Sequence, residues 1–204
     1  MGKDIFMFDH TIAGPPQDHP RFHFFKQGIA SVDEETASLY TLGHLIHRLG
    51  HDGRSDMILK VDIEGAELEV LSAMPSEIHR QFRQVTMEVH ALHRLGDAAY
   101  RAAFSAAFSR LNVDFTLFHI HANNYEPLGL VDGHTVANVL ELSYVRTDLV
   151  QRTASRTVYP TALDFPNWPP QPDHLLWFYP FLPLPENAGE AFQRSLSNSN
   201  RLYA

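Results

Sequence analysis

Carboxylates and a histidine stand directly after two apolar segments of this 204-residue sequence. Asp62, Glu64 and Gly65 follow the segment MILKV, and Glu88 and His90 stand at the end of the segment QVTMEVH. A carboxylate or an imidazole in such a place can take a proton from a reacting hydroxyl, which typically contributes a factor of about 10²–10⁴ to the rate. We therefore predict Asp62, Glu64 and His90 as catalytic residues.

The acids beside Gly65 have two further interpretations. Hard oxygen ligands suit Mg²⁺, so Asp62 and Glu64 could coordinate a divalent cation. Acids in the first turn of a helix also stabilise its dipole by roughly 0.3–1 kcal/mol, which explains Glu64 and Glu67 equally well. A role at the start of a helix explains Asp62 less well, because Ser or Thr would cap a helix there equally well and no acid would be needed.

A second polar run, HIHANN, follows later in the chain. His119 and His121 flank Ile120, so on a strand both side chains point to the same side. With Asn123 and Asn124 next to them, we expect these histidines to bind polar groups of an acceptor. A purely structural role, in which they bond loop backbone, is the alternative.

A metal-dependent hydrolase is a second, weaker hypothesis for the same residues. It lacks support from any H-E-x-x-H or similar ligand spacing, so we assign no metal ligands. The residues that it would use are His119, His121, Asp62 and either Glu64 or His90.

Strands and helices alternate along most of the chain, which predicts an α/β fold with a largely parallel sheet. The last two strands have a loop and no helix between them, which predicts an antiparallel edge. Ligands of open parallel sheets bind beyond the carboxyl ends of the strands, where Asp9, Asp62 and Glu88 fall. The predicted strands are 4–8, 22–25, 57–62, 84–89, 113–120 and 136–146, and the predicted helices are 38–49, 64–74 and 98–111 after a cap at Asp97.

The sequence changes character after about residue 150. Residues 1–150 form the predicted domain, whereas 151–204 hold most of the prolines, in runs such as PNWPPQPD and YPFLPLPE. We predict an extended arm there, held to the domain by aromatic residues that include Trp168 and Trp177, with a disordered end from about Asn187.

Composition excludes several classes of function. A formal net charge of −8 argues against broad binding to nucleic acid or to anionic lipid. No apolar run approaches the ~20 residues that a membrane span needs. The absence of cysteine excludes disulfides and thiolate chemistry and fits a cytoplasmic location.

The segments LKVDIEGAELEVL, VTMEVH, FHIHANNY and VLELSYVR, in this order, resemble the FkbM-type family of S-adenosylmethionine-dependent methyltransferases. The combination is more specific than any one segment, and the similarity extends over roughly residues 4–148. The resemblance implies a Rossmann-like methyltransferase fold that holds S-adenosylmethionine over the strand ends. It also implies O-methylation of a sugar-like or small-molecule hydroxyl.

The resemblance also implies roles for individual residues. Asp9 matches the acid that binds the ribose hydroxyls of the cofactor. Asp62 and Glu64 match the acids beside the transferred methyl group and the acceptor, and Asp62 is also expected to contact the cofactor. Glu88 and His90 match positions where acceptor contacts are expected.

One part of the family pattern is missing. The first strand and the glycine-rich turn that holds the methionine part of the cofactor should precede Asp4, and no Gly-x-Gly occurs in the sequence. We therefore expect a mostly parallel sheet that lacks its first strand. The chain is a piece of a longer protein, or it takes the missing part from a partner such as a second copy in a homodimer, or it is a binding module without catalytic activity. We favour the first explanation.

Overall fold

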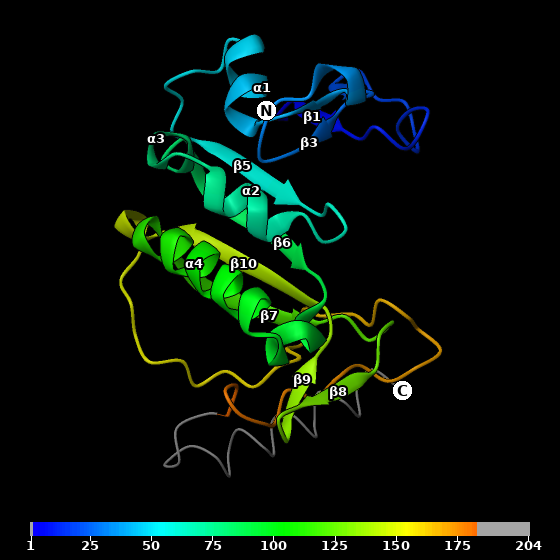
Figure 1. Ribbon diagram of the computed structural model, residues 1–204, viewed down its shortest axis with the longest axis vertical. Coiled ribbons are helices and arrows are strands. Elements are labelled where there is room, and N and C mark those ends of the chain that lie inside the picture. The colour runs from blue at the N-terminus through cyan, green and yellow to red at the C-terminus, as the bar shows by residue number, and fades with distance from the viewer. Residues whose placement is uncertain (1, 183–204) are drawn as a thin grey trace.

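The computed structural model describes residues 2–182 of the chain (Figure 1). The remainder of the predicted arm, with the disordered end predicted from Asn187, lies outside the described residues. The strands are β1 (Ile5–Phe8), β2 (Phe22–Phe25), β3 (Gly28–Ile29), β4 (Leu39–Tyr40), β5 (Met57–Val61), β6 (Phe82–Val89), β7 (Phe115–Ala122), β8 (Leu128–Val131), β9 (His134–Ala137) and β10 (Leu140–Arg146). The helices are α1 (Leu42–Arg48), α2 (Glu67–Ala73), α3 (Ser76–His79) and α4 (Ala98–Asp114), with short 3₁₀ turns at Glu35–Ala37, Leu92–Gly96 and Thr147–Leu149.

The central sheet has the strand order β5-β6-β10-β7. β5 pairs with β6 in parallel, and β10 runs antiparallel to both of its neighbours, so β5, β6 and β7 all run in one direction. The prediction of a largely parallel sheet is confirmed in this sense. The predicted antiparallel edge is confirmed, because the last two strands of the sheet, β7 and β10, pair antiparallel and β7 is the outermost strand.

The loop predicted between the last two strands of the sheet is wrong in part. There β8 and β9 form an antiparallel hairpin that projects from the sheet (Figure 1), and the strand predicted at 136–146 is divided between the end of β9 and β10. Asp132 and Gly133 connect the two strands with positive φ angles of 50° and 82°. An Asp-Gly pair with both φ values positive is a favoured two-residue hairpin turn, so the sequence carried the signal.

Helices α2 and α4 cover one face of the central sheet (Figure 1). Alternate residues of each strand point into the core between them, for example Leu59 and Val61 on β5 and Met87 on β6. Phe108 and Leu111 complete that core from α4, and this confirms the apolar stripe predicted for the helix. Side chains of the intervening positions therefore lie on the opposite face, which carries the polar residues of interest.

Two helices begin later than predicted. Glu64 and Gly65 have positive φ angles, which a helix does not tolerate, so α2 begins at Glu67. Ser38 also has a positive φ, and the next two residues form β4. α1 then begins after Thr41, whose side chain accepts a hydrogen bond from the backbone N–H of His44.

Up to residue 182 the arm contains no helix or strand, and it contacts β7, the outermost strand of the sheet, through Asp164 and Asp173. Tyr159 and Leu176 of the arm are buried against Ala122 and Ala137. Trp168 is 45% exposed, and its ring contacts that of Tyr125 edge to face, with 5.7 Å between the ring centroids. Its backbone is also fixed, as described below.

The N-terminal strands β1 and β2 pair in parallel and form a sheet of their own. Among residues 2–182, the outer edge of β1 and the outer edge of β5 have no strand partner. No helix in this part of the chain is long and apolar enough to cross a membrane.

Candidate functional site

The turn between β5 and α2 has an unusual backbone. Glu64 and Gly65 follow each other with φ angles of 56° and 105°. Glycine reaches this region without cost, whereas a residue with a Cβ atom rarely does. Contacts from elsewhere in the fold must therefore hold Glu64 in place, and the side chain of Glu64 projects into solvent with 87% of its area exposed.

Glu67, the first residue of α2, makes those contacts. Its side chain is 1% exposed, and its Oε1 accepts hydrogen bonds from the backbone N–H groups of Ile63 at 3.2 Å and Gly65 at 3.1 Å. The same oxygen lies 3.0 Å from Nδ1 of His90. The sequence indicated only a helix-dipole role for Glu67. The available signal was its place in the DIEGAE segment, within reach of the turn that it stabilises.

His90 follows β6 and lies among three carboxylates. Its Nδ1 contacts Glu67, whereas its Nε2 lies 3.6 Å from Glu64 and 3.7 Å from Glu88. Both of these distances are too long for a hydrogen bond. Tyr100 of α4 fixes the backbone by donating a hydrogen bond to the carbonyl of His90 at 2.7 Å. Among the described residues, Nε2 is thus left without a hydrogen-bond partner.

Glu88 and Asp62 complete the group. Burial raises the pKa of Glu88, the hydrogen bond from Asn123 at 2.8 Å lowers it, and the nearby charge of Asp62 raises it again, with a net increase. Asp62 is more exposed and pairs with Lys60 at 3.2 Å. Asp62, Glu88 and His90 each offer a ligand atom, and these atoms lie within 4.8 Å of one another. We call these three residues the strand-end cluster.

The structure thus brings together residues that the sequence placed at the ends of two different strands. Within residues 2–182, the strand-end cluster is the one group of three or more such side chains that could hold a metal ion. His119 and His121 are not part of it, so the ligand set of the hydrolase hypothesis does not form in the described chain.

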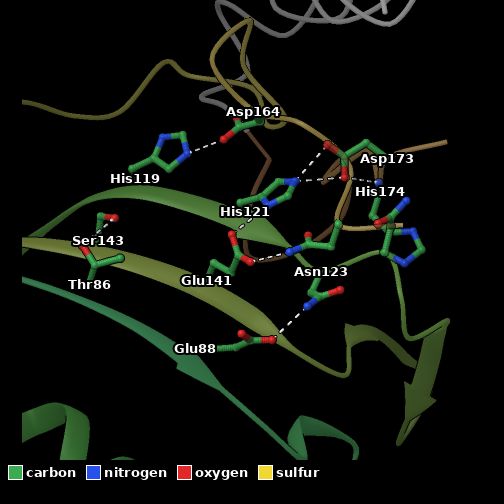
Figure 2. A network of polar contacts seen from close by, with 12 residues as sticks. Thr86, Glu88, His119, His121, Asn123, Glu141, Ser143, Asp164, Asp173 and His174 are labelled. Carbon is green, nitrogen blue, oxygen red and sulfur yellow. Dashed lines mark hydrogen bonds and ion pairs between the residues drawn. The ribbon is translucent and has the colours of Figure 1, made fainter. Parts of the chain in front are cut away.

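His119 and His121 instead contact the arm (Figure 2). Nε2 of His119 lies 2.7 Å from Asp164, and Nε2 of His121 lies 2.9 Å from Asp173. Nδ1 of His121 lies 3.1 Å from Glu141 on the neighbouring strand β10. Both ring nitrogens of His121 therefore face carboxylates, in a side chain that is only 5% exposed.

These contacts determine the charge of His121. Burial lowers the pKa of its imidazole, but the hydrogen bonds with Asp173 and Glu141 outweigh burial and raise the pKa to about 10. The hydrogen bond with His121 correspondingly lowers the pKa of Glu141. At neutral pH, His121 is therefore a cation between two anions.

The two asparagines of the HIHANN run point to different partners. Asn124 is buried, and its amide group bonds the arm backbone at Trp168, Gln171 and Pro172. Asn123 donates to Glu88 of the strand-end cluster (Figure 2). An acceptor could reach His121 or Asn124 only by replacing contacts with the arm, and it could reach Nε2 of His119 only by replacing Asp164. Asn123 and Glu88 are the predicted acceptor residues that lie at the cluster.

Asp9 follows β1 and is not joined to the strand-end cluster by any hydrogen bond or ion pair among the described residues. Its Oδ1 accepts hydrogen bonds from the backbone N–H and the hydroxyl of Thr11, at 2.7 and 2.6 Å. These bonds hold the pKa of Asp9 below its ordinary value. A cavity of about 340 Å³ lies in the loop between β1 and β2. It is lined by Pro15, Asp18, His19, Pro20 and Phe22 and by no residue of the cluster.

Comparison with known proteins identifies the family of the chain. The family model described as the methyltransferase FkbM domain matches residues 5–125, a range that starts in β1 and includes Asp9, the strand-end cluster and the HIHANN run. A search of curated proteins found no match. Because the family model matches more than half of the sequence, the chain belongs to the FkbM methyltransferase family.

Proposed function

We propose that this protein takes part in the transfer of a methyl group from S-adenosylmethionine to a hydroxyl oxygen of a sugar-like or other small-molecule acceptor. The observation that carries the proposal is Nε2 of His90, which has no hydrogen-bond partner among residues 2–182 and lies 3.6 Å from Glu64 and 3.7 Å from Glu88. A base that is fixed on one side and unpartnered on the other suits the removal of a hydroxyl proton.

When bound, the sulfonium of S-adenosylmethionine supplies an activated methyl group with a thioether as the leaving group. His90 accepts the hydroxyl proton at Nε2 as the bond between oxygen and the methyl carbon forms. Glu88 and Glu64 lie on that side of the ring and stabilise the resulting imidazolium. The remaining task of the site would be to position the acceptor hydroxyl for transfer, and positioning of this kind lowers a barrier substantially.

Asp9 and Asp62 are the proposed cofactor contacts. The hydrogen bonds that Asp9 accepts from Thr11 and Ile12 all go to Oδ1. The other oxygen is thus available for a ribose hydroxyl. Replacement of Asp9 by Ala should weaken the binding of S-adenosylhomocysteine, measured by calorimetric titration, more than it lowers turnover at saturating cofactor. An unchanged affinity would remove Asp9 from the proposal.

We further propose that the cofactor pocket is completed by a strand that lies outside this sequence or in a second copy of the chain. β1 and β5 are both members of parallel pairs, and each has one unpaired edge within residues 2–182. Titration with S-adenosylhomocysteine separates the alternatives. Micromolar binding means that the chain forms a complete pocket, and no binding by a folded chain favours a fragment or a binding module without catalysis.

A divalent cation is a second element of the proposal. The strand-end cluster offers the carboxylates of Asp62 and Glu88, whose oxygens suit Mg²⁺, and a cation held by these two acids leaves Nε2 of His90 to act as the base. A bound cation would lower the proton affinity of an acceptor hydroxyl that it contacts. Titration of the protein with MgCl₂, followed by calorimetry, tests this element. Binding that Glu88→Gln abolishes would support it, and binding that this variant leaves unchanged would place the cation elsewhere.

The direct test of the function is a methyl-transfer assay with a panel of hydroxylated acceptors, made on the longest natural version of the protein that binds cofactor. We expect Asp62→Asn to abolish transfer while the circular-dichroism spectrum stays unchanged. Glu69→Gln, on the exposed side of α2, is the matched control. If Asp62→Asn retained full activity, the role given to Asp62 would be wrong.

A further inference from the structure

Glu67 is a buried acid that the proposed chemistry does not use. It is 1% exposed in the core beneath the turn, whereas its neighbour in the same helix turn, Glu69, is exposed. Burial of a carboxylate is costly unless hydrogen bonds compensate for the lost water. Three donors converge on its Oε1, and they come from two different strand ends.

These three contacts determine where the proton of His90 lies. Two of the partners of Oε1 are the backbone N–H groups of Ile63 and Gly65, so this oxygen acts as an acceptor. The third partner, Nδ1 of His90 at 3.0 Å, must therefore donate. A neutral imidazole carries only one ring proton. With that proton on Nδ1, Nε2 has a lone pair and can act as a base.

We propose that Glu67 is a positioning residue, whose buried carboxylate keeps the ring proton of His90 on Nδ1 and holds the turn at residues 63–65 against the same ring. The catalytic consequence of this inference, that Nε2 acts as a base, rests on the proposed function. The position of the ring proton and the contacts of the turn do not depend on that function. A carboxylate behind a working imidazole is a common device for fixing both the tautomer and the orientation of the ring.

The shared oxygen has a further consequence for the turn. Because Oε1 binds both the turn and the imidazole, a displacement of the turn would also shift the imidazole of His90. Glu64, held at a positive φ by this arrangement, keeps its carboxylate on the Nε2 side of the ring. Glu67 thus links the end of β5 to the end of β6 through a single atom.

The first test needs only the folded chain. Long-range ¹H–¹⁵N correlation spectra of the ¹⁵N-labelled protein report which ring nitrogen of each neutral histidine carries the proton. The signals of His90 are identified among those of the 13 histidines by their loss in His90→Gln. We expect the proton on Nδ1. A proton on Nε2 in the unaltered protein would overturn the inference, without bearing on whether the chain binds a cofactor.

The second test compares Glu67→Gln with Glu69→Gln, which removes the same charge from the same helix turn. A neutral amide oxygen is a weaker acceptor than a carboxylate, by a factor of about two in energy. In Glu67→Gln we expect a mixture of the two His90 tautomers and about tenfold faster hydrogen exchange at the amides of Ile63 and Gly65. Spectra and exchange rates that match those of Glu69→Gln would contradict the inference.

A kinetic readout separates positioning from general stability. Where methyl transfer is measurable, Glu67→Gln should lower kcat about tenfold or more and leave the KM for the cofactor near its original value. A loss of stability alone would lower the active fraction equally for Glu67→Gln and for a core variant such as Leu71→Ala, without a change of tautomer. If the unaltered protein transfers no methyl group but shows the Nδ1 tautomer, the proposed function fails and the positioning role remains.

Discussion

His90 and His121 are each surrounded by carboxylates, yet their surroundings differ in one decisive respect. His121 is 5% exposed and has a carboxylate within about 3 Å of both ring nitrogens. His90 has one such contact, to Glu67, and its other nitrogen lies 3.6 Å or more from the nearest carboxylate. Both ring nitrogens of His121 thus have a hydrogen-bond partner, whereas at His90 only Nδ1 has one among the described residues.

This difference separates a structural ion network from a site that can do chemistry. A buried cation with two bonded anions has no capacity left for a ligand, and its task is to join β7, β10 and the arm. A ring that is held on one side keeps a free nitrogen for a proton, a hydroxyl or a cation. Satisfaction of hydrogen bonds therefore distinguishes the two histidines better than the residue types around them.

The largest effect that we expect comes from breaking the satisfied network. His121→Ala leaves Asp173 and Glu141 without their shared cation, and Asp173 is only 3% exposed. Loss of one partner from a buried ion pair typically costs about 3–5 kcal/mol. Urea unfolding should show a decrease of that order in the free energy of unfolding. A decrease below about 1 kcal/mol, the range of surface ion pairs, would show that the network is not structural.

Replacement of His90 should lower activity strongly and stability only slightly. We expect His90→Gln to lower methyl transfer by a factor of about 10² or more, the usual contribution of a general base. Its free energy of unfolding should fall by about 1 kcal/mol, since one hydrogen bond is lost. His93→Gln, on the exposed turn that follows, is the control for activity. Equal losses of stability in His90→Gln and His121→Ala would erase the distinction between the two sites.

The pH dependence of stability sharpens the comparison. The pKa of His121 is raised to about 10 in the folded protein, against about 6.5 for an unperturbed imidazole. Between these values the folded state holds a proton that the unfolded state has lost, so stability is full below about pH 6.5 and falls as the pH rises toward 10. Melting temperatures measured from pH 6 to 10 should decline in the unaltered protein. The decline should be smaller in His121→Gln, and equal slopes would contradict the assignment.

His79 gives the smallest expected effect, with the opposite sign. It is 2% exposed, and neither of its ring nitrogens has a hydrogen-bond partner in the part of the chain that the structure describes. Burial lowers its pKa, and the charge of Asp114 at 3.6 Å opposes that shift only in part. Because the unfolded state binds this proton more readily, stability falls as the pH drops below about 6.5.

His79→Leu should therefore flatten the acid limb of the curve of melting temperature against pH. At pH 7 it should change the free energy of unfolding by less than about 1 kcal/mol in either direction, because an unpaired buried polar group is replaced by an apolar one. A large loss at pH 7 would mean that the imidazole forms a contact that stabilises the fold.

Much of the fold follows from local patterns in the sequence. The apolar stripe of α4, its cap at Asp97 and the strand β5 lie where the sequence predicts them, because burial on one face imposes a period that is visible in the residues. The position of β10 between β6 and β7 was not predictable in this way. Strand order depends on pairing between distant segments, and no local pattern encodes it.

The candidate site was predictable in its members but not in its geometry. Asp62, Glu88 and His90 were all identified from their positions at strand ends, and the structure places them together. The hydrogen bonds of His121 and Asn124 with the arm could not be predicted, because their partners lie about 50 residues away in a segment without a periodic hydrophobic pattern. The role of Glu67 was missed because an acid at the start of a helix already has a simple explanation.

The edges of β1 and β5 that have no strand partner within residues 2–182 affect how solutions of this chain will behave. An exposed strand edge is a template on which another chain can add, and the side chains of Ile5 and Ile58 on these strands are 47% and 65% exposed. We expect the isolated chain to self-associate as its concentration rises, which light scattering over a dilution series would detect. A ligand titration made at high concentration would then report on assembled chains, so affinities should be measured across that dilution series.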